Sequence, residues 1–181
     1  MKTTSITRSL LISATLANAT MFTLLPAYAQ EKHHVSYQVP AENTKYVQQH
    51  VIDAGDVKGH QVRILEIKKT LPNDTLLFNG INVVEEWDRG YSDYIDGNGR
   101  NWGYLTFLLE NGDKIYGRFD GNAQTVIAAD GSKKSSGIGT ATLSGGTGKF
   151  RGIRGTIRNS YVFDPGKGYN TGQAEGDYWI E

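Results

Sequence analysis

The chain has 181 residues, with 19 basic and 19 acidic side chains and no cysteine. This balanced charge argues against a nucleic-acid-binding protein, which needs an excess of Lys and Arg on one face. The absence of cysteine excludes disulfides and thiolate metal ligands.

The first 29 residues have the three-part pattern of a secretory signal peptide. Lys2 and Arg8 precede an apolar segment from Leu10 to Leu25, and Ala27-Tyr28-Ala29 then offers small residues at the −3 and −1 positions. We expect cleavage before Gln30 and a secreted or periplasmic protein. The apolar segment is short and rich in Thr, Ser and Asn, so no membrane span is expected. A mitochondrial or plastid transit peptide is the alternative, because acidic residues are absent from this segment.

The remaining residues, 30–181, are predicted to form a single domain. They number 152 and carry a net charge of −2 once Lys2 and Arg8 are removed. This length suffices for a sizeable hydrophobic core. All 22 glycines lie in this part of the chain, about twice the usual frequency of ~7%. Because they follow no repeat, they indicate turns and bulges.

Strand and turn signals alternate along this domain, and no long segment has a helical period. Residues Ala41 to His50 fit either a short helix or an early strand. Asp96-Gly97, Asn111-Gly112 and Asp130-Gly131 are typical hairpin turns. Because sheet edges are best buried by closure, we expect an all-β fold, a closed antiparallel barrel of about eight strands. The strands are predicted at His60–Thr70, Ile81–Ile95, Asn101–Glu110, Lys114–Ala128, Lys133–Ser144, Gly155–Phe163 and Gly172–Ile180, with His34–Val39 or Lys45–Ile52 as an eighth.

The hairpin around Asn111-Gly112 predicts which side chains share a face. A two-residue loop would place Leu108 opposite Ile115 and Leu105 opposite Arg118. Both faces of this hairpin are then substantially apolar, whereas a monomeric barrel needs only one apolar face. We therefore expect the outer wall to be covered by the N-terminal segment or by another subunit, most simply in a homo-oligomer. One predicted face has Trp102, Tyr104, Thr106, Leu108, Ile115 and Phe119, and the other has Leu105, Phe107, Leu109, Tyr116 and Arg118.

A glycine-rich segment from Leu143 to Gly155 contains the sequence Gly-Gly-Thr-Gly-Lys-Phe-Arg-Gly. It resembles the segment that joins two late strands in plant allene oxide cyclases and dirigent proteins. The resemblance implies an eight-stranded barrel and, by analogy with the plant barrels, a trimer. Physically, these glycines allow bulges and close backbone crossings, and Phe150 and Ile153 are predicted to plug one end. A phosphate loop is a poor fit, because a strand follows instead of a helix.

Acidic residues in apolar rows provide the candidate ligand-binding site. Period two places Glu85 in a row with Ile81, Val83 and Trp87, and it places Glu66 in a row with Val62 and Ile64. A carboxylate that faces a core needs a partner or a raised pKa. Arg118 would be that partner, and Tyr116 would donate a hydrogen bond. We therefore predict that four residues point inward and bind a ligand: Glu66, Glu85, Tyr116 and Arg118. A structural ion pair, or rows that face solvent, is the alternative.

Other chemistries have little support in the sequence. The four histidines, His33, His34, His50 and His60, have no metal-binding spacing. The segment Asp93–Gly99 is better explained as a hairpin turn than as a calcium loop. No Gly-x-Ser-x-Gly motif occurs, which argues against an α/β-hydrolase nucleophile. No metal and no cofactor are expected.

Three functions remain open. The first is an extracytoplasmic barrel that binds one small, lipophilic molecule in its interior. The second, implied by the resemblance, is a cofactor-free cyclase, isomerase or dirigent-type enzyme that steers a reactive intermediate by positioning and electrostatics. The third is a structural or interaction barrel without a ligand. An unbroken apolar interior would favour the third, whereas a cavity with a buried Glu and Arg would favour the enzyme.

Overall fold

The computed structural model describes residues 30–181, so the predicted signal peptide lies outside the described residues. This part of the chain is nearly all strand, with three short 3-10 helices: η1 (Ala41–Asn43), η2 (Gly148–Phe150) and η3 (Pro165–Lys167). Both candidates for the additional strand are strands in the structure. The strands are β1 (His33–Val39), β2 (Thr44–Asp53), β3 (His60–Thr70), β4 (Leu77–Phe78), β5 (Ile81–Ile95), β6 (Asn98–Leu109), β7 (Lys114–Ile127), β8 (Lys133–Gly146), β9 (Ile153–Asp164) and β10 (Tyr169–Ile180).

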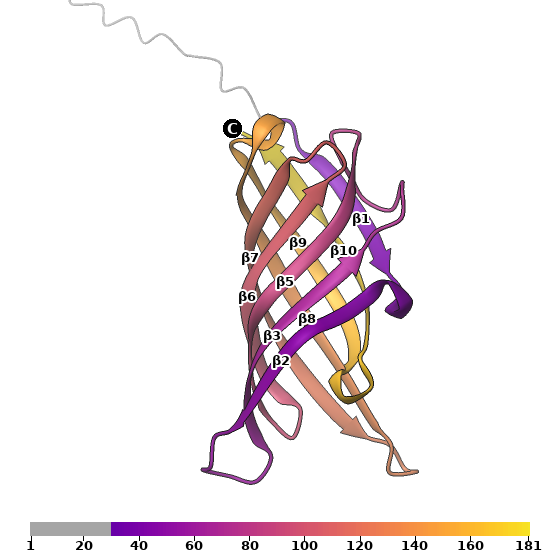
Figure 1. Ribbon diagram of the computed structural model, residues 1–181, viewed down its shortest axis with the longest axis vertical. Helices are drawn as coiled ribbons and strands as arrows, with labels where there is room; N and C mark the ends of the chain where they lie inside the picture. The colour runs from indigo at the N-terminus through magenta and orange to yellow at the C-terminus, as the bar shows by residue number, and fades with distance from the viewer. Residues whose placement is uncertain (1–29) are drawn as a thin grey trace, which may run out of the picture.

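The strands form one antiparallel sheet in the order β1-β10-β9-β8-β7-β6-β5-β3-β2, with the short β4 paired to β5. The sheet is strongly curled, and its two edge strands, β1 and β2, are consecutive in the chain and joined through η1 (Figure 1). Asn170 of β10 donates a hydrogen bond to the hydroxyl of Tyr46 in β2, at 3.3 Å, and so links the two margins of the sheet. The predicted all-β, antiparallel barrel architecture is confirmed.

Of two predicted two-residue hairpin turns, one has the predicted length and the other is one residue longer. Asp96 and Gly97 form a two-residue turn with positive φ values of 50° and 79°, and Ile95 pairs with Asn98 as predicted for this type of turn. The Asn111-Gly112 loop has three residues, because the amide of Leu109 bonds the carbonyl of Asp113 at 2.9 Å. The predicted register of β6 against β7 is therefore wrong by one residue, and Ile115 pairs with Phe107 instead of Leu108.

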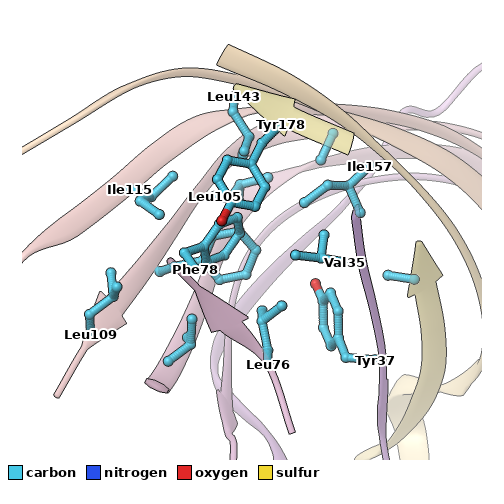
Figure 2. Close-up of a cluster of buried hydrophobic side chains, with 14 of the residues drawn as sticks. Val35, Tyr37, Leu76, Phe78, Leu105, Leu109, Ile115, Leu143, Ile157 and Tyr178 are labelled. Atoms are coloured by element: carbon cyan, nitrogen blue, oxygen red, sulfur yellow. The ribbon is translucent and has the colours of Figure 1, made fainter. Parts of the chain in front are cut away.

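A hydrophobic core fills the end of the barrel where the glycine-rich segment and the C-terminus meet (Figure 1). Phe78, Phe150 and Ile153 are fully buried there, which confirms that Phe150 and Ile153 plug one end. Phe78 packs edge-on against Tyr178, with 4.9 Å between ring centroids. Figure 2 shows Phe78 and Leu105 in the centre of this cluster, with Tyr37 at its margin. The core thus closes one end and leaves the remaining interior for a site.

Within residues 30–181, no helix is long and apolar enough to cross a membrane.

Candidate functional site

The barrel interior contains a cavity of about 120 Å³ next to the core. Its wall includes apolar side chains from five strands, which point inward because alternate residues of a strand share a face. This volume is comparable with an apolar cavity of ~150 Å³ that binds benzene. A larger hollow of about 740 Å³ adjoins it and shares Ser160, Tyr161 and Gln173 with its lining. The apolar residues on these five strands include Leu65, Ile67, Leu105, Phe107, Phe119, Ala141 and Ile157.

A buried cluster of charged and polar groups lies in the cavity wall. The ammonium of Lys69 on β3 is 2.6 Å from Oε1 of Glu86 and 2.8 Å from Oδ2 of Asp88, both on β5. The hydroxyl of Tyr37 on β1 donates a hydrogen bond to Oε2 of Glu86 at 3.1 Å. Glu86 is only 4% exposed. The cluster therefore holds its carboxylate in a fixed position, away from bulk water.

The electrostatics of this cluster follow from one cation shared between two acids. Burial would lower the pKa of Lys69, but the charges of Asp88 and Glu86 outweigh this effect and hold it well above its usual range. Burial is the main cause of the raised pKa of Glu86. The positive charge of Lys69 lowers this pKa, and the negative charge of Asp88 raises it. Burial also raises the pKa of Tyr37, and the charge of Glu86 adds to that effect. Lys69 thus stays charged, and Glu86 is the group best suited to exchange a proton.

A second polar group in the wall consists of tyrosines held by asparagines. The amide of Asn101 donates to the hydroxyls of Tyr94, at 3.0 Å, and Tyr161, at 2.6 Å. Asn170 donates similarly to Tyr46. Burial raises the pKa of each of these three tyrosines, so they remain protonated hydroxyl groups. Arg63 and Ser92 complete this part of the cavity wall.

The four residues predicted to point inward lie outside the cavity lining, so their predicted orientation is wrong. Arg118 and Tyr116 are exposed, and the guanidinium of Arg118 lies over the ring of Tyr104. Glu85 pairs with Lys68 at 2.5 Å, and Glu66 pairs with Arg89 at 2.6 Å. Both glutamates therefore form structural ion pairs, which was the alternative to a ligand-binding site. The predicted ligand-binding role of these four residues stays a prediction.

Irregularities in strand pairing explain the inverted faces. A bulge between Val83 and Glu85 adds one residue to β5, so inward-facing positions change from odd to even numbers. Val83 and Glu86 are therefore both buried, and Glu85 points outward. The three-residue loop at Asn111-Gly112 similarly turns β7 over relative to the prediction. A one-residue shift in register exchanges every side chain between core and solvent.

The sequence contains a signal for the observed cluster that strand alternation alone does not reveal, namely the order of charges along two neighbouring strands. Arg63, Leu65, Ile67 and Lys69 form one alternating row on β3 with two apolar residues between two cations. On β5, Glu86 and Asp88 form the complementary acidic row. Lys69 and Glu86 are cross-strand partners in the observed register. Matching these rows by charge would have brought Lys69 and Glu86 together.

No protein-family model matches the chain, and no curated protein matches it. Among solved structures, the pterocarpan synthase dirigent protein GePTS1 is similar, with a TM-score of 0.48 and 15% identity over 93% of this chain and 100% of that chain. The pterocarpan synthase dirigent protein PsPTS1 has a TM-score of 0.44 and 16% identity over 84% of this chain and 96% of that chain. Both are dirigent proteins, one of the two families that the glycine-rich segment resembles. The likeness to allene oxide cyclases stays a prediction.

Proposed function

We propose that this barrel binds one small, mainly apolar molecule in its interior, outside the cytoplasm. The observation that supports this proposal best is the cavity itself, whose wall combines an apolar section with polar groups held in place by hydrogen bonds and ion pairs. Small-molecule sites have this composition, because apolar walls provide affinity while a few polar groups fix orientation. The apolar part of the ligand would pack against Leu105, Phe107 and Ile157.

The experiment is mass spectrometry of small molecules released from the protein purified from its native host. We expect one compound, or a narrow class, in roughly stoichiometric amount. Ala141→Phe should abolish retention, because residue 141 is buried in the cavity wall and a larger side chain would fill the space. Ala54→Phe is the matched control, since Ala54 is exposed in the loop after β2. Equal retention by both variants would contradict an interior site.

The pattern of residues 1–29 supports the extracytoplasmic part of the proposal. N-terminal sequencing of protein from the periplasm or the medium should begin at Gln30. Recovery of intact chain from the cytoplasm alone would contradict export.

A second candidate function is cofactor-free catalysis of a cyclisation, isomerisation or coupling in the same cavity. The specific observation that favours it is Glu86, a buried carboxyl group with a raised pKa beside Lys69 and Tyr37. A buried Glu and an Arg in one cavity were the features expected of an enzyme, and Glu86 and Arg63 both line this one. A carboxyl group whose pKa is raised by burial is of the kind that serves as a general acid or base.

For a cyclisation or an isomerisation, this candidate predicts a change of structure in the bound molecule without a change of mass, whereas a coupling would give a heavier product. Small-molecule extracts of the native host should be incubated with wild-type protein and analysed by liquid chromatography and mass spectrometry. We expect a compound of unchanged mass and altered retention time to form with the wild-type protein but not with Glu86→Gln. Glu85→Gln is the matched control on the outer face. If the protein retained a ligand but converted no compound, the binding function would still be supported and the enzymatic function would be contradicted.

A further inference from the structure

Arg63 and Ser92 are cross-strand partners on β3 and β5, and both line the interior cavity. Nε of Arg63 and Oγ of Ser92 are buried, and neither forms a hydrogen bond with the described residues. Ser92 is only 1% exposed. Buried polar atoms nearly always have a partner, because an unmade hydrogen bond costs free energy. Two neighbouring donors in one cavity wall therefore indicate an acceptor that a ligand would supply.

The charge of Arg63 also has no counter-charge within residues 30–181. Its terminal nitrogen donates to the amide oxygen of Gln61 at 2.9 Å, and no described carboxylate lies within ion-pair distance of it. Lys69, in contrast, pairs with both interior acids. A cation in a partly buried wall is stabilised when an anion binds beside it. The cavity thus has one cation to offer to a ligand.

The surroundings of Arg63 show that its charge acts on the cavity. Burial raises the pKa of Tyr46 and of Tyr94, and the charge of Arg63 acts in the opposite direction on both hydroxyls. The hydroxyl of Tyr46 accepts a hydrogen bond from Asn170, so its own proton remains available for a further acceptor. The charge of Arg63 therefore reaches the tyrosine hydroxyls of the same cavity wall.

We propose that Arg63 and Ser92 bind the carboxylate of a small organic acid whose apolar body lies in the cavity. This inference rests on the proposed interior binding function and names its ligand class. A carboxylate suits a guanidinium because it is planar and accepts two hydrogen bonds in parallel. A monoanion also suits the single unpaired cation, whereas a dianion would be repelled by the acids at Glu86 and Asp88.

The test compares acids with their neutral amides, which have nearly the same shape. Phenylacetate, 3-phenylpropionate and octanoate, each beside its amide, are titrated into the protein near neutral pH and followed by protein NMR. At least one acid should bind about tenfold more tightly than its amide, as for a hydrogen bond to a charged group. In Arg63→Gln the acid and its amide should bind about equally, while the affinity for the amide is unchanged.

Two further variants keep the inference falsifiable. Ser92→Ala should reduce the preference for the acid by about threefold or more, even if Arg63→Gln fails to fold. Arg158→Gln, on the exposed surface of β9, should leave it unchanged. Equal binding of acid and amide by the wild-type protein would overturn the carboxylate site and leave interior binding intact. If none of the six compounds bound, the proposed binding function itself would be contradicted.

Discussion

The hydroxyl of Tyr37 lies 3.1 Å from Oε2 of Glu86 and joins β1, at one edge of the sheet, to β5 across the barrel interior. Tyr37 is 8% exposed and Glu86 is 4% exposed, so this hydrogen bond is screened from water. It links the core to the charged part of the cavity, because the ring of Tyr37 also packs edge-on against Phe107.

Tyr37→Phe should therefore destabilise the protein by about 1.5–3 kcal/mol, as expected when a hydrogen bond to a charged buried group is lost. Tyr169→Phe should have almost no effect, because Tyr169 is 42% exposed. Urea unfolding followed by circular dichroism measures both changes. Equal stability of the two variants would show that the Tyr37 hydrogen bond contributes little.

Lys68 and Lys69 provide a matched comparison of an outer and an inner ion pair. Lys69→Met leaves Glu86 and Asp88 without their cation in the interior, so it should cost about 3–5 kcal/mol. Lys68→Met removes the partner of Glu85 on the outer wall, where water screens the pair, and should cost less than about 1 kcal/mol. Urea unfolding of both variants near pH 7 tests this difference.

The deficit of Lys69→Met should also shrink as the pH falls, because protonation removes the unpaired carboxylate charges. A deficit that stayed constant down to acid pH would argue that lost packing, rather than unpaired charge, destabilises the variant.

His60 links the loop after β2 to β5 through two carboxylates. Its Nδ1 is 2.6 Å from Asp56 and its Nε2 is 2.7 Å from Asp93. The hydrogen bonds to Asp93 and Asp56 raise the pKa of His60 above its usual value, which is about 6.5. Its contribution to stability should be fully present below about pH 6.5 and lost as the pH rises through the raised folded-state pKa.

Unfolding free energies of the wild-type protein and His60→Gln should therefore differ most at acid pH and converge at alkaline pH. The exposed His50 gives the control variant His50→Gln, for which we expect a small difference at every pH. A wild-type advantage that grows as the pH rises would contradict this account.

The outer wall of β5, β6 and β7 presents aromatic side chains to the surface. Tyr91 and Trp102 stack with 5.8 Å between ring centroids, and Tyr104 and Tyr116 are 56% and 44% exposed. Such a group of exposed aromatic residues is typical of interfaces. We predict a homo-oligomer, for example a trimer. Tyr104→Lys should weaken its assembly. Light scattering that reports only monomer at tens of micromolar would contradict the prediction.

The sequence by itself determined the all-β class, most strand positions and the plugged end of the barrel. These features depend on local or strongly repeated signals. His60–Thr70 and Ile81–Ile95 are runs of strand-forming residues and match β3 and β5 residue for residue. Asp96-Gly97 sets its own turn, because both residues must adopt positive φ. Phe150 and Ile153 are large apolar residues in a short glycine-rich segment, and the core is where they can be buried.

Only the tertiary structure decided which face of each strand is inside. One bulged residue in β5 placed Glu86 inside and Glu85 outside, and one additional loop residue turned Tyr116 and Arg118 outward. Alternation defines two faces but does not say which one is buried, and apolar residues occupy both faces here. The pairing of Lys69 with Glu86 and Asp88 likewise depends on the register of β3 against β5. Register is fixed by contacts between segments distant in sequence, so the site emerged only with the folded barrel.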